Sequence, residues 1–332
     1  MIKTVAETAW HHEGDFSFMR NLVETICTKT NADYVKLHIT LDLDEYMSQD
    51  HQNYQMQAPW IFNEGEWSEL IAIVRLNNKK LMLLLNDTKA IKFASKHSPE
   101  VVELHSVCLN VPRLQKAVMN HIDSNAIIMI GVGGSTIEEV DQAVNFFSKR
   151  QVVLMFGFQN YPTKYENINL AKARKIQSLY PSLEFGYADH TSWNESNNEL
   201  ITLLGAANNM HYVEKHVTTE YGVDRCDYSA AISIDMFNSL SENVSLLNQI
   251  TGDGNIALNQ GEISYSQIGP MKMAPYAIKS FNKGHTLKED DFDFIRTSQI
   301  GDITQVHSIN LLGKTLNKDV KKRQVLLMSH FS

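Results

Sequence analysis

Two histidines in similar local settings are the residues whose chemistry is easiest to interpret. His190 ends the strand-like segment GYADH, and His216 ends the strand-like segment VEKH. These segments belong to the last two of eight strand-like runs, and in a (β/α)8 barrel the carboxyl ends of the strands surround one pocket. Two neutral imidazoles that meet there could bind a divalent metal. The pair therefore predicts a metal site, and the alternative is two buried histidines bonded to backbone carbonyls.

The elements that must position these histidines follow a regular alternation. Short aliphatic or β-branched runs lie near residues 3–7, 33–39, 80–86, 101–106, 126–132, 152–158, 183–189 and 211–217. Between them, apolar residues recur three or four apart, which is typical of amphipathic helices. Alternating strands and helices imply parallel pairing with right-handed crossovers. Eight such units predict an α/β protein with a (β/α)8 TIM barrel over residues 1–255, and a doubly wound open sheet is the alternative on pattern alone.

The composition changes after the helical pattern that ends near residue 249. A Gly-Asp-Gly-Asn sequence at 252–255 and a polar stretch with glycines at 261 and 269 predict a linker over residues 256–273. Turn signals at 282–284, 301–302 and 312–314 then divide short strand-like runs. We therefore expect a small, mostly β domain over residues 274–332.

Charge and cysteine content exclude several classes of protein. The formal net charge is −8, whereas binding to nucleic acid requires clustered Lys and Arg, so we expect no nucleic-acid partner. The three cysteines, Cys27, Cys108 and Cys226, form no C-x-x-C pair, which favours reduced thiols in a cytoplasmic protein. The chain does not begin like a signal peptide, and no apolar run reaches about 18 residues, so we expect neither export nor a membrane span.

Several segments resemble, in order, those of one enzyme family. Matches to its motifs AEIG-x-N-H-N-G, GADAVKFQ, YPTPYE, GYSDHT and EKHFT occur at residues 5–14, 31–36, 161–166, 186–191 and 214–218. The tail at residues 278–284 and 293–296 resembles the family's antifreeze-like (SAF) domain. The family is that of the N-acetylneuraminate (sialic acid) synthases and relatives that make other nonulosonic acids. The resemblance spans nearly the whole chain and favours the closed barrel.

The resemblance implies a reaction. Phosphoenolpyruvate would condense with an open-chain N-acyl amino sugar such as N-acetylmannosamine, giving a nine-carbon 2-keto acid and phosphate. A manganese ion held by His190 and His216 would polarise the sugar aldehyde. Glu7 would handle protons as water adds and phosphate leaves, and Lys36 would face the donor phosphate. On the residues alone, Glu7 and Lys36 could equally form a structural ion pair.

The resemblance also implies substrate contacts and a partner. Tyr161, Gln159 and Asp227 would contact the acceptor sugar, although the sequence around Asp227 departs from the family's GPDH motif. Arg296 of the small domain would reach the N-acyl group of sugar bound in another copy of the chain. The implied assembly is a domain-swapped homodimer whose other partners are the small-molecule substrates.

The chain departs from the family where the phosphate would bind. On the fourth strand, FKIASGE is replaced by VVELHSV, which aligns the family's second anion-binding lysine with Val102, its serine with His105 and its glutamate with Val107. The second-strand glutamine is replaced by His38, and the serine of GYSDHT by Ala188. Most expected contacts to phosphoenolpyruvate are therefore missing.

Three functions are consistent with these departures. In a synthase with a rebuilt phosphate site, imidazolium forms of His38 and His105, together with the backbone at Gly131, Gly133 and Gly134, would hold the anion. A metal-dependent barrel enzyme could instead act on another sugar or keto acid. A catalytically inactive sugar-binding homologue is the third alternative, because a fold alone does not define a function.

Overall fold

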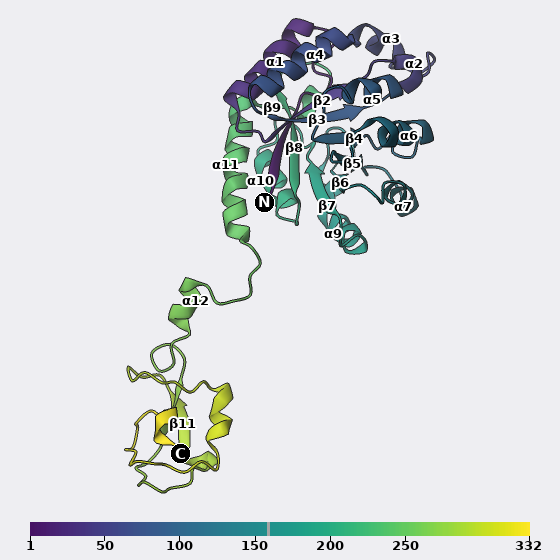
Figure 1. The fold of residues 1–332 in the computed structure, drawn as a ribbon. Coiled ribbons are helices and arrows are strands. Elements are labelled where there is room, and N and C mark those ends of the chain that lie inside the picture. Colours follow the sequence, from purple (N-terminus) through teal and green to yellow (C-terminus); the bar gives the residue numbers. More distant parts are fainter. Residues whose placement is uncertain (158–159) are drawn as a thin grey trace. The chain divides into compact units, whose positions relative to one another are not determined.

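The computed structural model describes residues 1–157 and 160–332, which form two compact units, Met1–Gly252 and Asp253–Ser332 (Figure 1). Gln159, one of the expected sugar contacts, lies outside the described residues. In the first unit the strands pair in chain order and are all parallel, and β1 pairs with both β2 and β8. This closure makes the sheet a barrel, so the prediction of a TIM barrel is confirmed and the open sheet is excluded.

The barrel strands agree closely with the runs expected from the sequence. They are β1 (Lys3–Glu7), β2 (Tyr34–Ile39), β3 (Lys80–Leu85), β4 (Val101–Leu104), β5 (Ile127–Gly131), β6 (Val152–Phe156), β7 (Glu184–Ala188) and β8 (Tyr212–Thr218). A short parallel strand, β9 (Ile232–Ser233), pairs with the end of β8.

Helices lie outside the barrel and connect successive strands (Figure 1). The longer ones are α1 (Phe16–Lys29), α4 (Glu64–Leu76), α5 (Thr88–Ala94), α6 (Pro112–His121), α7 (Ile137–Phe146), α9 (Leu170–Leu179), α10 (Asn198–Ala206) and α11 (Ile234–Thr251). Short helical segments are α2 (Leu43–Tyr46), α3 (Tyr54–Gln57), α8 (Tyr165–Ile168) and the 3-10 helices η1 (Ala58–Trp60) and η2 (Tyr228–Ala230). Several helices start at clear signals; Thr136 and Glu139, for example, form a capping box on α7.

Side chains along each barrel strand alternate between two environments. On β2, Val35 and Leu37 belong to the apolar layer between strands and helices, whereas Tyr34 belongs to a smaller apolar cluster inside the barrel. The same alternation directs Lys36 and His38 inward, where both line a cavity. The barrel interior is therefore apolar at one end and polar toward the carboxyl ends of the strands.

The alternation corrects one expectation from the sequence. We expected Val102 to replace an anion-binding lysine of the pocket, but Val102 is buried in the apolar layer between the strands and the helices. Its neighbour Glu103 faces the cavity instead. Because a one-residue shift in a strand exchanges its two faces, the pocket position on β4 holds a carboxylate.

The second unit has its own small core. Strands β10 (Ala274–Ala277) and β11 (Phe292–Ile295) pair antiparallel, and isolated bridges link other short extended segments. The unit also contains α12 (Gln260–Tyr265) and the 3-10 helices η3 (Glu289–Asp291), η4 (Val306–Leu311) and η5 (Met328–His330). Leu287, Leu311 and Leu326 are fully buried within its apolar cluster. A small additional domain therefore follows the barrel.

None of the helices in residues 1–157 and 160–332 has the length and apolar character that a membrane crossing requires.

Candidate functional site

A cavity of about 340 Å³ opens at the carboxyl ends of the barrel strands. Its lining includes eight of the ten site residues expected from the sequence, namely Glu7, Lys36, His38, His105, Tyr161, His190, His216 and Asp227. This is the end of a barrel at which catalytic residues of known TIM-barrel enzymes lie. The structure therefore gathers residues that are up to 220 positions apart, Glu7 and Asp227, around one pocket.

The two histidines expected to bind a metal lie side by side. The ring centroids of His190 and His216 are 4.8 Å apart, with the rings nearly perpendicular. Burial lowers the pKa of His216 to about 3, and burial and the neighbouring His216 hold the pKa of His190 well below 6.5. Both rings are therefore neutral near pH 7, which is the form that binds metals.

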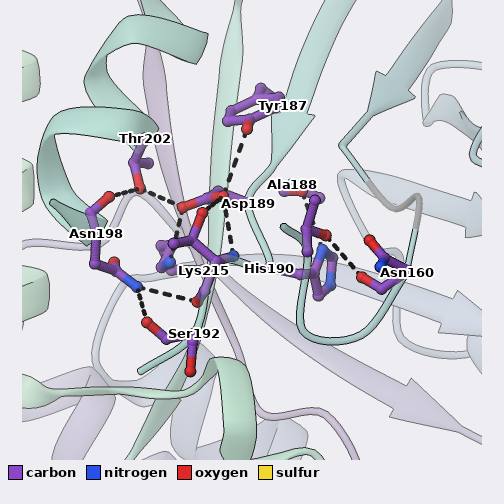
Figure 2. Close-up of polar contacts among 11 residues, drawn as sticks. Asn160, Tyr187, Ala188, Asp189, His190, Ser192, Asn198, Thr202 and Lys215 are labelled. Atoms are coloured by element: carbon purple, nitrogen blue, oxygen red, sulfur yellow. Dashed lines mark hydrogen bonds and ion pairs between the residues drawn. The ribbon is translucent and has the colours of Figure 1, made fainter. Parts of the chain in front are cut away.

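A buried network holds the segment that carries His190 (Figure 2). The carboxylate of Asp189 accepts hydrogen bonds from the Thr191 backbone and hydroxyl, from the Thr202 hydroxyl at 2.7 Å and from Lys215 at 2.9 Å. Burial opposes ionisation of Asp189, but Lys215 and the hydroxyl donors lower its pKa below the ordinary value. Asp189 therefore stays ionised and fixes the backbone that follows His190.

His216 is oriented by groups from two other segments. Its Nε2 lies 3.3 Å from the Glu7 carboxylate, and its Nδ1 lies 3.3 Å from the Tyr161 hydroxyl. The Tyr161 hydroxyl also donates to the backbone carbonyl of Asp227, whose carboxylate accepts a hydrogen bond from the Trp10 backbone. The sugar contacts expected at Tyr161 and Asp227 thus lie beside the expected metal ligand.

The donor set fits a two-histidine metal site. The Nδ1 atom of His190 lies 3.1 Å from the Ala188 carbonyl, so Nδ1 carries the proton and Nε2 carries the lone pair that a metal requires. Among residues 1–157 and 160–332, no group of three or more His, Cys, Asp or Glu side chains is arranged to hold a metal ion. A metal bound by His190 and His216 would therefore take its other ligands from water and substrate, as in a catalytic site.

Deeper in the cavity, one ammonium group is surrounded by three carboxylates. The Nζ atom of Lys36 lies 2.7 Å from Glu103, 2.9 Å from Glu214 and 3.4 Å from Glu7. Lys36 is only 2% exposed, and the three carboxylates come from β4, β8 and β1. The lysine expected to face a substrate phosphate is thus already paired within the protein.

This cluster has an excess of acid over base, and the carboxyl pKa values reflect it. Burial raises the pKa of Glu103 to about 7, although Lys36 opposes the shift. Burial and the neighbouring Glu7 raise the pKa of Glu214 well above 4.5. Burial alone would lower the pKa of Lys36, but the three carboxylates together raise it. Glu103 can therefore gain or lose a proton near neutral pH.

The pKa values of His38 and His105 do not favour the imidazolium forms suggested for them. Burial, His105 and Lys36 hold the pKa of His38 well below 6.5, and burial and Lys36 lower that of His105 to about 4. The Nε2 atom of His38 lies 2.8 Å from the Asn86 amide, a contact between neutral groups. Both histidines line the cavity as neutral rings and supply no replacement charge for the missing lysine.

The remaining expected residues lie in different places. Gly131 and Gly133 line the cavity, and Gly134 adopts a left-handed conformation with φ of 73° before α7. Arg296 belongs to the second unit, where its guanidinium donates to the carbonyl of Pro270. Val107 is exposed, and Ala188 lines the cavity without a hydroxyl.

Sequence reasoning missed Glu103 and Glu214 as site residues. A signal was present for both, because each is a carboxylate within a strand-like run and such groups are rarely buried unless they are paired. Trp10 and Tyr46 also line the cavity and were not expected to do so. Neither has a sequence pattern that distinguishes it from an ordinary core aromatic residue.

Fold and site together define a TIM-barrel protein with a histidine-rich polar pocket at the catalytic end of the barrel. The sequence model of the NeuB family matches residues 22–256, which is more than half of the chain. The protein belongs to this family. An uncharacterised protein of Methanocaldococcus jannaschii is 22% identical over 326 residues, which are 97% of this chain and 92% of the relative.

Two solved structures resemble the chain in fold. A spore coat polysaccharide biosynthesis protein E from Chromobacterium violaceum has a TM-score of 0.84 at 16% identity, with full coverage of both chains. An N-acetylneuraminic acid (sialic acid) synthetase from Leptospira borgpetersenii has a TM-score of 0.71 at 20% identity, covering 80% of this chain and 90% of that one. These two structures show the fold, and membership of the NeuB family supports a sugar-acid synthase-like function.

Proposed function

We propose that the protein is a metal-assisted nonulosonic (sialic-type) acid synthase. It would condense phosphoenolpyruvate with an open-chain N-acyl amino sugar such as N-acetylmannosamine and release phosphate. The observation that carries the proposal is the meeting of His190, His216, Glu7 and Tyr161 around one cavity in a chain of the NeuB family. These groups provide metal ligands, a proton carrier and a hydroxyl for the sugar within one pocket.

Each residue has a role that its contacts support. His190 and His216 would hold a divalent metal, with manganese as the ion implied by the family resemblance. When bound, the metal supplies Lewis-acid polarisation of the aldehyde and orients the reactants. Glu7 lies 3.3 Å from His216 and 3.4 Å from Lys36, so it can give or take a proton at the cavity wall. Tyr161 and Asp227 would position the hydroxyl groups of the acceptor.

The second candidate is the same kind of pocket acting on another sugar or keto acid. One observation favours it, because all three carboxylates around Lys36 oppose the entry of a phosphate dianion. A catalytically inactive sugar-binding homologue is the third candidate, and no contact in the pocket favours it. The proposed homodimer, in which Arg296 reaches the sugar site of the partner, predicts a particle of twice the 37.7 kDa chain mass by light scattering.

The test is product formation by the purified full chain. Manganese-loaded protein is incubated with phosphoenolpyruvate and a panel of N-acyl hexosamines, and both phosphate release and the nine-carbon 2-keto acid are measured by mass spectrometry. We expect coupled release of phosphate and keto acid with at least one sugar, and loss of both in a His190→Ala variant. Metal and sugar binding without either product, across the whole panel, would reject the phosphoenolpyruvate reaction and move the assignment to the second candidate.

A further inference from the structure

The ammonium of Lys36 is surrounded by carboxylates of the protein itself. An ammonium carries three N–H groups, and three carboxylates lie within 3.4 Å of Nζ. Glu103 is the nearest of the three, at 2.7 Å, and the three carboxylates come from three different strands. A phosphate could reach Lys36 only by displacing one of these contacts.

Glu103 is the contact with the fewest other bonds in the described structure. Glu7 also contacts His216, and Glu214 makes two hydrogen bonds to Lys36, at 2.9 and 3.0 Å. Glu103 lines the cavity, and the carboxylate lies close to Gly131, where an added Cβ would come within 3.7 Å of its Oε1. Its carboxylate therefore lies close to both Lys36 and the carboxyl end of β5.

We propose that Glu103 determines which donor the pocket accepts. Its carboxylate occupies the position beside Lys36 that a phosphate dianion would take, so it acts as an internal anion that a phosphorylated donor must displace. A three-carbon acid without phosphate meets a smaller barrier, because it brings less negative charge to the cluster. This inference rests on the proposed function, since it concerns the donor side of the same pocket.

The test measures binding of the donor alone, without metal or sugar. Phosphoenolpyruvate and pyruvate are titrated by calorimetry at about pH 8, where Glu103 is ionised, into metal-free wild-type protein, Glu103→Gln and the control Glu138→Gln, which removes an exposed carboxylate of α7. We expect Glu103→Gln to bind phosphoenolpyruvate about tenfold or more tightly than the wild type, because it removes one repelling charge near Lys36. Pyruvate binding should change much less, and Glu138→Gln should match the wild type.

A second variant protects the test against a folding defect. Glu103→Leu removes the charge at similar volume, and thermal unfolding shows which of the two variants is folded. If the folded variant binds phosphoenolpyruvate no more tightly than the wild type, or gains equally for pyruvate, the proposal is overturned. The result is independent of catalysis, so a protein that makes no product can still show the shift, and an active synthase can fail to show it.

Discussion

Two buried lysines of the barrel differ in what surrounds them. Lys215 faces outward between β8 and α10, is 1% exposed, and pairs with Asp189, whose carboxylate also accepts hydrogen bonds from Thr191 and Thr202. Lys36 faces inward, is 2% exposed, and has three carboxylates around it. The outward pair is balanced in charge and bonded, while the inward cluster has two more acids than bases.

This difference in charge balance distinguishes a structural ion pair from a group of side chains that can exchange protons. The pKa of Asp189 lies below its ordinary value, so the carboxylate is committed to the charged state. The pKa of Glu103 is raised to about 7, so a proton can be gained or lost near neutral pH. Carboxyl groups in a cavity whose pKa values are strongly shifted, and whose charge is not balanced by neighbouring cations, are typical of functional sites.

The largest expected effect concerns the structural pair. Lys215→Met removes the cation that pairs with Asp189 and leaves a buried carboxylate without that charge partner. We expect the free energy of unfolding to fall by about 3–5 kcal/mol, as measured by urea denaturation. The control Lys175→Met, on the exposed surface of α9, should fall by less than about 0.5 kcal/mol. Equal losses of unfolding free energy in both variants would show that the Lys215–Asp189 pair does not stabilise the fold more than an exposed lysine does.

The next effect tests whether His190 and His216, which line the same cavity as Lys36, bind a metal. If His190 is a metal ligand as proposed, His190→Ala should weaken manganese binding by more than the roughly tenfold to hundredfold seen when a ligand's supporting partner is lost. Paramagnetic resonance of free manganese during titration measures this without activity. The exposed His51→Ala variant should keep wild-type affinity. Unchanged affinity in His190→Ala would place the metal elsewhere.

A smaller effect depends on pH and has opposite signs in the two regions. Because the pKa of Glu103 is raised from 4.5 to about 7, the folded protein retains a proton that the unfolded chain loses between these values, so this group's stabilisation is lost as pH rises through that window. Asp189 behaves oppositely and loses its contribution as pH falls below 3.8.

The contribution of Glu103 to the pH dependence of stability can be isolated with a variant whose residue 103 does not titrate. The difference in unfolding free energy, Glu103→Gln minus wild type, should grow by about 1–3 kcal/mol between pH 5 and pH 8. Urea denaturation at both pH values measures it. A difference that stays constant or shrinks over this range would contradict a raised Glu103 pKa.

The smallest expected effect is the loss of one hydroxyl from the outward network. Thr202→Val removes the hydrogen bond to Asp189 while keeping the shape of the side chain. We expect a loss of about 1 kcal/mol in unfolding free energy, against less than about 0.5 kcal/mol for the exposed Thr28→Val. A loss as large as that of Lys215→Met would mean that the hydroxyl, rather than the lysine, holds Asp189 in place.

The barrel could be predicted from the sequence because its signals are local. Aliphatic runs, helical spacing and turn residues recur eight times, and the observed strand β1 coincides with its predicted run 3–7. His190 and His216 could be placed together since parallel strands share one carboxyl end.

The charge cluster could not be predicted in the same way. Which side chains of a strand face the pocket depends on its register to within one residue. The alignment to the family's fourth-strand motif therefore placed Val102 in the pocket instead of Glu103. The protonation states of His38 and His105 depend on burial, which no local pattern encodes. The gathering of carboxylates from β1, β4 and β8 around Lys36 appears only once the barrel is closed.

The most direct test of the account is calorimetric titration of phosphoenolpyruvate into manganese-loaded protein, with a His190→Ala, His216→Ala double variant as control. The account predicts saturable binding to the wild type that is about tenfold or more weaker in the double variant. Confirmed metal loading of the wild type without any binding of phosphoenolpyruvate would contradict it.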